Sequence, residues 1–204
     1  MRHSISHAAC GLAIALALAP AAMAQTTRVA AEVKAGAYVA DTSHSKVTWS
    51  VSHFGFSTYV GQFAGVTASL KLDPANLGAT ALDATVQTAA VGTLNPALDT
   101  HLKAPDFLDV AKFPTATFKA TSVKSTGAST ADITGDLTLH GVTRPVVLQA
   151  TFTQAGVSPI DKKYTVGFSA KTVVKRSEFG IKTYVPAISD DVTLQIDTEF
   201  KAAS

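Results

Sequence analysis

Few residues in this sequence have the types and the spacing that bind metals. His44 and His53 are nine residues apart, so they face opposite sides if one continuous strand contains both. A zinc site needs imidazole nitrogens that converge at about 2.0–2.1 Å from the ion, and neither a cysteine pair nor an HExxH motif adds ligands here. We therefore predict no metal site. His53 is either a head-group or entrance residue, or a core histidine hydrogen-bonded to a neighbour.

Two arginines have the chemistry to bind an anionic head group. Arg144 lies in the segment His140–Pro145, which joins two expected strands, and Arg176 precedes the aromatic bend Phe179–Ile181. A guanidinium pairs its donors with phosphate oxygens, but the simpler interpretation of each is a solvated or structurally paired arginine. The sequence contains no serine-elbow motif and no glycine-rich phosphate loop, so it predicts a protein that is not an enzyme.

The stretch Asp41–Phe63 must position these residues, and it begins as a clear strand. From Val47 to His53, apolar and polar residues alternate, which is typical of a half-buried β-strand. An aromatic and glycine-rich segment from Phe54 to Phe63 follows without a simple period. Large rings beside residues that allow tight bends predict a rim or a pocket wall, although a core corner has the same composition.

The rest of the chain repeats the strand pattern. About eight alternating runs separated by turn residues predict a single antiparallel sandwich or barrel. Small residues at many inward positions favour a hollow barrel over a filled one, because eight strands enclose room for one ligand when the side chains are small. These small residues are Ala68, Ala84, Ala116, Ala120, Gly135, Ala150 and Ala170.

One segment breaks the strand pattern. Asn95-Pro96 has the form of a helix start, with asparagine as the cap and proline at the first helical position. Leu98 and Leu102 are four residues apart and would share a face, and Pro105 ends the helix. We expect this short helical insert to cover one end of the barrel as a lid or plug.

The first residues are typical of an export signal. An apolar run is followed by Ala22-Met23-Ala24, a small-x-small cleavage pattern, so residues 1–24 are predicted to be a signal peptide. The only cysteine, Cys10, leaves with it, and residues 25–37 are expected to form a flexible leader. Of 17 basic and 15 acidic residues only Arg2 is lost, which leaves a balance of 16 to 15 and no electrostatic case for nucleic acid. We predict a periplasmic location.

Short motifs spread over the chain resemble one family of bacterial exported proteins. Together they are similar to the YceI-like, polyisoprenoid-binding family, and the resemblance covers Tyr38 to Phe200, within a domain of residues 38–204. The resemblance implies an all-β fold, a lipocalin-like, extended eight-stranded antiparallel barrel with a short helical insert, which holds a long amphiphile. The motifs are Asp41–Ser45, Val51–His53, Gly61–Phe63, Asp99–Pro114, Thr117-Phe118, Thr134–Pro145 and Arg176–Ile181.

Three functions follow as hypotheses, in order of support. The first is a carrier of an isoprenoid or other long-chain lipid, as a monomer or homodimer with transient membrane contact and no further cofactor. The second is an enzyme whose constellation assembles only in three dimensions, and the third is a filled barrel that binds a membrane redox or stress partner. For the carrier, the expected cavity lining is Trp49, Val51, His53, Phe54, Phe56, Phe63, Phe107, Phe118, Leu137, Phe152, Phe168, Phe179 and Ile181, with Arg176 and Arg144 as head-group candidates.

Overall fold

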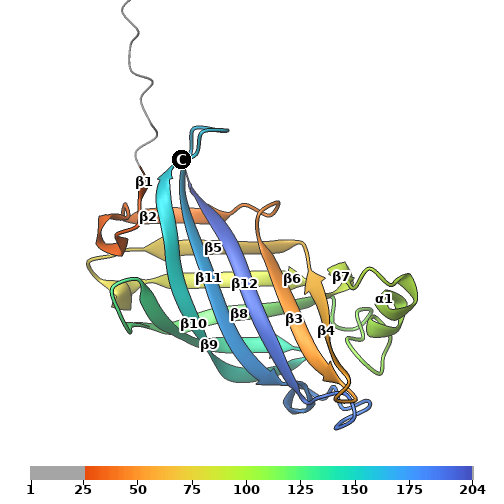
Figure 1. Cartoon of the computed structure of the whole chain (residues 1–204). Helices are drawn as coiled ribbons and strands as arrows, with labels where there is room; N and C mark the ends of the chain where they lie inside the picture. Colours follow the sequence, from red (N-terminus) through yellow and green to blue (C-terminus); the bar gives the residue numbers. More distant parts are fainter. Residues whose placement is uncertain (1–25, 204) are drawn as a thin grey trace, which may run out of the picture.

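The computed structural model describes residues 26–203, which form one antiparallel β-barrel (Figure 1). The strands are β1 (Thr26–Thr27), β2 (Gly36–Ala40), β3 (Lys46–His53), β4 (Ser57–Phe63), β5 (Val66–Leu72), β6 (Ala81–Gln87), β7 (Val91–Gly92), β8 (Thr115–Ser125), β9 (Thr130–Leu139), β10 (Val142–Val157), β11 (Tyr164–Lys175) and β12 (Asp191–Ala202). The helices are α1 (Pro96–Leu102) and the 3-10 turns η1 (Ala30–Glu32), η2 (Leu77–Ala79), η3 (Thr88–Ala90) and η4 (Arg176–Phe179).

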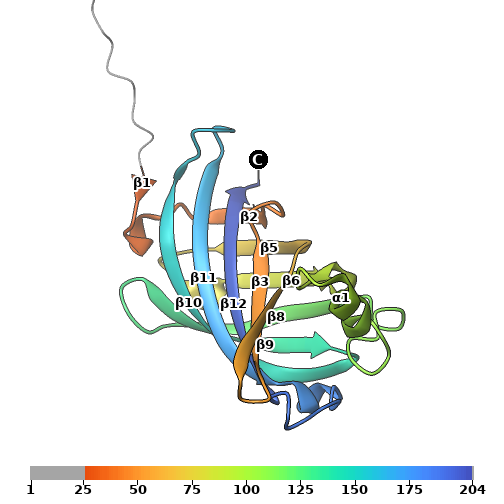
Figure 2. The same ribbon diagram turned by 45° about the vertical axis from the view of Figure 1, so that its right-hand side comes forward.

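Eight strands close the barrel. The order β10-β9-β8-β6-β5-β2-β12 is completed by β11, which pairs with both β12 and β10. Every pairing is antiparallel, and Figure 2 shows the strands wrapping around one interior. The predicted eight-stranded antiparallel barrel is therefore confirmed. Closure leaves few unpaired edges, which protects the sheet from pairing with other chains.

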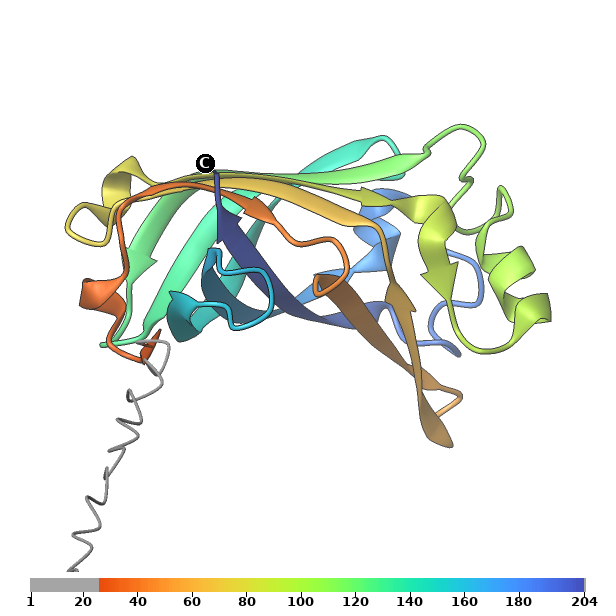
Figure 3. The ribbon, with the colours of Figure 1, turned by 90° about the horizontal axis from the view of Figure 1, so that it is seen from above.

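The organising stretch forms a hairpin that leaves the barrel wall at one end. Strand β12 pairs with β2 over Phe200–Ala202 and with β3 over Thr193–Asp197, so β3 continues the wall where β2 ends. Strand β4 pairs with β3 along its whole length but meets β7 only at Gln62 and Phe63. Figure 3 shows the β3–β4 hairpin, in brown, projecting away from the body of the barrel.

The predicted helix forms at its predicted start. The Asn95 side chain accepts hydrogen bonds from the backbone N–H groups of Ala97 and Leu98 at 3.2 and 3.3 Å, which caps α1. The Asp99 carboxylate accepts from the Thr93 N–H at 2.8 Å and fixes the segment before the helix. Helix α1 lies at the end of the barrel near β7 (Figure 1). No helix within residues 26–203 has the length and hydropathy needed to cross a bilayer.

The predicted flexible leader, residues 25–37, contains secondary structure in its described part, residues 26–37. Strand β1 pairs with β10, and η1 follows it directly. Val33 is buried against the core, because its side chain fills the end of the barrel beside Tyr38 and Phe200. The predicted signal peptide, residues 1–24, lies outside the described residues.

The buried side chains gather in two clusters at opposite ends of the barrel. One cluster contains Tyr38, Leu70, Phe152, Val166 and Phe200 together with neighbours from β2, β5, β10, β11 and β12. The other is built on Trp49, Val91, Leu108 and Ile181. Between them many wall residues, such as Ala116, Leu137 and Ile196, are only partly buried although they face the interior.

A candidate ligand-binding cavity through the barrel

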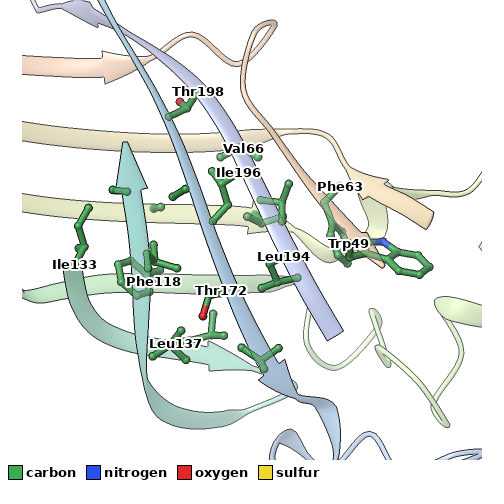
Figure 4. A pocket seen from close by; sticks show the side chains of 18 of the residues that line it. Trp49, Phe63, Val66, Phe118, Ile133, Leu137, Thr172, Leu194, Ile196 and Thr198 are labelled. Carbon is green, nitrogen blue, oxygen red and sulfur yellow. The ribbon is translucent and has the colours of Figure 1, made fainter. Parts of the chain in front are cut away.

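A cavity of about 860 Å³ runs through the barrel between the two clusters. Its volume lies in the upper part of the range of small-molecule sites, about 300–1,000 Å³. All barrel strands except β2 contribute inward side chains to it, and Figure 4 shows those of Phe118, Ile133, Leu137, Leu194 and Ile196, among others, facing one space. The wall is almost wholly aliphatic and aromatic. Such a wall suits the apolar chain of a lipid.

Small residues make the barrel hollow, as the sequence predicted. Ala68, Ala84, Ala116, Ala150 and Ala170 all line the cavity. Their short side chains leave the central space open, because eight strands with larger inward residues would fill it.

Two other small positions, Ala120 and Gly135, are not part of the lining. At Gly135 a Cβ atom would stand 2.4 Å from Cζ of Phe118, so this glycine lets the phenyl ring lie flat against the wall. Gly135 therefore shapes the cavity without touching it.

Trp49 is the largest side chain of the aromatic end. Its indole lies over Gly61, where an added Cβ would come within 2.2 Å of Cζ2, and it stacks on Tyr59 with ring centroids 6.5 Å apart. The indole Nε1 has no hydrogen-bond partner among the described residues. Trp49 is therefore held by packing alone, directly in the cavity wall.

The cavity reaches the surface at both ends, and the two mouths differ. At one mouth, half-exposed aromatic residues line the opening: the exposed fractions are 53% for Phe54 and 57% for Tyr184, and both belong to the lining. The His101 ring stands edge-on to Phe107 at 4.8 Å and lies 6.4 Å from Tyr184. At the opposite mouth the exposed lining residues are small, namely Ala31, Ser125, Gly127, Ala128 and Thr130.

The helical insert covers the aromatic mouth. Leu98 and Leu102, the pair predicted to share one helix face, both line the cavity. The turn after the helix adds Phe107 and the buried Leu108 to the same wall. The insert therefore closes part of this end of the barrel, as expected for a lid or plug.

Arg176 is buried, with 6% of its surface exposed, and its donors are committed to the backbone. Nε donates to the Ser189 carbonyl at 3.0 Å, Nη1 to the carbonyls of Ile181 and Thr183 at 3.2 and 2.8 Å, and Nη2 to Ile188 at 2.9 Å. Burial lowers the pKa of Arg176. The side chain touches the cavity, but it holds the loop 181–189 in place. This arrangement matches the structurally paired arginine rather than the head-group candidate.

A carboxylate supports the same loop. Asp190 accepts hydrogen bonds from the Ser177 N–H at 2.8 Å and from the Ser177 hydroxyl at 2.7 Å. Burial alone would raise the pKa of Asp190, but the hydrogen bonds from Ser177 and the nearby charges of Lys175 and Arg176 hold it below its usual value. The ionised carboxylate therefore anchors η4, which carries Arg176.

Arg144 lies outside the cavity. It is exposed at the start of β10, and its hydrogen bond goes to the Thr143 carbonyl at 3.3 Å. It borders a separate surface depression with Pro145, Lys175 and Phe179. The barrel cavity therefore does not include this head-group candidate: Arg144 alternates in phase with the inward Val146 and Leu148, but it lies exposed at the start of β10 and is not part of the lining.

Most of the predicted lining residues do face the cavity, and two do not. Phe56 is 91% exposed at the hairpin tip, and Phe179 is 1% exposed and packs outside the cavity. Both predictions were wrong because neither residue belongs to a run with a period of two. The predicted residues that line the cavity are Trp49, Val51, His53, Phe54, Phe63, Phe107, Phe118, Leu137, Phe152, Phe168 and Ile181.

Several lining residues were missed by the sequence reasoning. Tyr59, His101, Tyr184 and Ile188 all reach the cavity at the aromatic mouth. Tyr59 lies on β4, where the many aromatic residues obscure the alternation of the strand. Of these four residues, it is the one that a strand pattern in the sequence could have identified. Tyr184 and Ile188 belong to a loop placed by Arg176, which no local pattern reveals.

A polar cluster lies at the other end of the barrel, where β2 passes to β3. The Asp41 carboxylate accepts hydrogen bonds from Lys201 Nζ at 2.7 Å, Ser43 Oγ at 2.6 Å and His44 Nδ1 at 2.9 Å. Lys201 also binds Asp161 at 2.6 Å. The Lys201 bond, followed by those of Ser43 and His44, holds the pKa of Asp41 far below its usual range, and Lys201 lowers the pKa of Asp161 to about 2.

Asp41, His44 and Glu199 stand close enough to share a cation, with ligand atoms within 4.8 Å of one another. The ammonium group of Lys201 already supplies the positive charge at Asp41. The hydrogen bond to Asp41 raises the pKa of His44. The arrangement is therefore that of an ion-pair clamp between β2, β12 and the β10–β11 turn.

The fold and the cavity together define a class of protein: a closed, hollow, lipocalin-like β-barrel with an apolar interior. The chain belongs to the YceI-like domain family, whose model matches residues 38–200. A protein from Pseudomonas savastanoi pv. phaseolicola, described as "UPF0312 protein", is 39% identical over 186 residues, 90% of this chain and 95% of its own length.

Solved structures show the same fold. The YceI protein of Campylobacter jejuni is 32% identical and superposes with a TM-score of 0.67, covering 73% of this chain and 88% of its own. A domain from Saccharophagus degradans described as polyisoprenoid binding has a TM-score of 0.61 at 14% identity, covering 83% of this chain and all of its own. At that identity the likeness concerns the fold alone.

Proposed function

We propose that this protein binds a long apolar amphiphile, such as a polyisoprenoid, a polyprenyl quinone or a similar lipid, inside its barrel. The apolar cavity of about 860 Å³ that runs between two mouths is the observation that carries the proposal. Burying each CH₂ group contributes about 0.8 kcal/mol, so a long chain binds firmly without any charged contact. The description of the S. degradans domain as polyisoprenoid binding agrees with this ligand class.

The charge of the cavity wall limits which head group the ligand can carry. Within the described residues, the cavity lining contains no Lys, Asp or Glu, and its one permanent cation, Arg176, has its donors bound to backbone carbonyls. A phosphate buried there would lack a counter-ion, which is costly in an apolar site. The ligand therefore has a neutral head, such as a quinone or amide, or keeps a charged head in water at a mouth.

The protein acts as a carrier or buffer rather than as an enzyme in this proposal. Its family and its barrel support a binding role. The signal peptide predicted for residues 1–24 supports a periplasmic location, where a lipid with a long apolar chain needs a soluble carrier. No further cofactor is required for such a role.

Native mass spectrometry of residues 25–204, purified without detergent and followed by denaturing extraction, tests the proposal. We expect a stoichiometric lipid, or its uptake after incubation with a polyprenyl quinone. The single tryptophan, Trp49, lies in the wall and gives a second readout, since a quinone bound beside it should quench its fluorescence. A mass that stays free of ligand, with unchanged fluorescence, would instead support a barrel that binds no lipid and acts as an interaction partner of a membrane redox or stress system.

A further inference from the structure

The tip of the β3–β4 hairpin exposes two phenylalanines to solvent. Phe56 is 91% exposed and Phe54 is 53% exposed. The turn is tight, since Phe54 and Gly55 have φ values of 53° and 74° and the Phe56 N–H donates to the His53 carbonyl at 3.0 Å. Positive φ at both central residues matches the right-handed twist of a hairpin. The exposed rings therefore sit on a defined turn.

The tip is also anchored to the rest of the barrel. The Phe54 N–H donates to the Ala187 carbonyl at 2.8 Å, and the Ser189 N–H donates to the Ser52 carbonyl at 3.0 Å. These bonds join the hairpin to the loop that Arg176 holds. The two apolar rings are thus presented on a braced support.

The hairpin has no charged residue other than the one at its start. From Val47 to Leu70 the sequence contains no Asp, Glu, Lys or Arg, a stretch that covers both strands of the hairpin. Exposed strand edges of soluble proteins usually carry charges that prevent unwanted contacts. Desolvating this hairpin costs no buried charge, whereas a charged tip would resist transfer to an apolar medium.

The tip is continuous with the aromatic mouth of the cavity. His53 and Phe54 line the cavity, and Tyr184, 57% exposed, lines the same opening. Tyrosine is enriched at the interface between a bilayer and water, and phenylalanine is common on the apolar face of segments that lie in that interface. Contact of this face with a bilayer would set the mouth against the lipid phase.

We propose that the Phe54–Phe56 tip inserts into the surface of a lipid bilayer and sets the aromatic mouth against it. This inference rests on the proposed function, because it names the source from which the cavity takes its ligand. A bilayer fits better than a protein partner or a second copy of the chain, since the tip offers apolar rings without any charge to specify a partner. Insertion driven by apolar contact is insensitive to salt.

Vesicle flotation of the chain from residue 25 onward tests this docking, with vesicles of phosphatidylethanolamine and phosphatidylglycerol. We expect Phe56→Ala to weaken binding by about tenfold or more, and Phe56→Asp to weaken it further. Ile160→Ala is the matched control, because Ile160 is 89% exposed in the β10–β11 turn, at the opposite end of the barrel from the hairpin (Figure 1). It should bind as the unaltered protein does, at low and at high salt.

Three results would overturn the docking proposal. One is equal binding by Phe56→Ala and the unaltered protein. Another is a loss of binding in high salt, which would indicate attraction by surface charge. The last is a concentration-dependent dimer in sedimentation that Phe56→Ala abolishes, which would make a second copy the occupant of the tip.

Ligand delivery separates this inference from the proposed function. A polyprenyl quinone presented in cyclodextrin should quench Trp49 equally in Phe56→Ala and in the unaltered protein, whereas its transfer from vesicles should be slower in the variant. If the quinone in cyclodextrin binds neither protein, the proposed function fails, and the vesicle flotation still decides whether the tip docks on a bilayer. If transfer from vesicles is equally fast in both, the docking inference fails alone.

Discussion

The two ends of the barrel differ in how firmly they are packed and in how open they are to solvent. At the Tyr38 end, eight side chains form a well-buried cluster, and the Lys201 clamp ties β2, β12 and the β10–β11 turn together. Burial and the neighbouring Tyr164 raise the pKa of Tyr38 to about 12, so its hydroxyl stays protonated and donates to the Lys34 carbonyl. At the Trp49 end the cluster is smaller, and aromatic rings reach the surface around the opening.

The difference shows how one barrel combines stability with access. The Tyr38 end is fixed by side-chain packing and by ion pairs. The Trp49 end has a smaller buried cluster and a loop held by Arg176 and Asp190, while its rings face the cavity and the solvent. Regions that admit ligands have few buried contacts, and such regions are the least stable parts of a domain. Stability and ligand exchange are thus assigned to different ends.

The largest expected effect is at Arg176, which holds the Trp49 end. Arg176→Ala leaves four buried or partly buried carbonyls without their donor, which should cost about 3 kcal/mol or more in unfolding free energy. Chemical denaturation measures this loss. Arg144→Ala is the control and should stay within about 0.5 kcal/mol, since Arg144 is exposed. A small change in unfolding free energy in Arg176→Ala would show that the hydrogen bonds of Arg176 are not needed to hold the loop 181–189.

The next largest effect is expected on lipid uptake, from a substitution that narrows the cavity between the two ends. Ala170→Phe places a ring in the cavity and should reduce lipid uptake about tenfold or more, because the ring occupies room that the ligand needs. Native mass spectrometry measures the retained lipid. Ala81→Phe, at an exposed position of β6, should change nothing. If Ala170→Phe instead unfolds the protein, as overpacking of a filled core would, the hollow interior is refuted.

A smaller effect is expected at the wall beside Trp49. Gly61→Ala would bring its Cβ to 2.2 Å from the indole, so the ring must move, at a cost of about 1–3 kcal/mol. The emission of this single tryptophan should shift as its surroundings change. Gly92→Ala is the matched control, because nothing lies within 4 Å of its added Cβ. Unchanged emission in Gly61→Ala would show that the ring is not held against this glycine.

The smallest effect is a pH dependence at the Tyr38 end. The bond to Asp41 raises the pKa of His44 above its value of about 6.5 in the unfolded chain. The protonated form therefore stabilises the fold fully below about 6.5, and this contribution is lost as the pH rises through the raised pKa. Melting curves of His44→Gln should lack that loss. An equal pH dependence in both proteins would assign it to another group.

The same linkage has the opposite sign at Asp41. Its lowered pKa gives stability that is present above about 3.9 and is lost as the pH falls toward the depressed value. The two groups share one hydrogen bond. Their combined effect therefore favours the clamp in mildly acidic solution and weakens it at either extreme.

The alternating strands were accessible from the sequence because a period of two is a local property. Val47, Trp49 and Val51 were assigned to the inner face, and the structure places all three in the cavity wall. The helix start at Asn95-Pro96 was equally local, since its cap and its proline act within one turn. Five of the inward alanines, interpreted as room for a ligand, line the cavity, whereas Ala120 does not.

The sequence by itself thus determined the strands, their inner faces, the capped helix and the hollow interior. Only the tertiary structure decided which mouth is aromatic, that Arg176 is tied while Arg144 is outside, and that Phe56 projects from the molecule. These features depend on contacts between residues far apart in the chain, such as Phe54 with Ala187 and Lys201 with Asp41. The alternation of residues along a strand shows which side chains face inward. Which distant residues these side chains contact depends on how the strands pair to close the barrel.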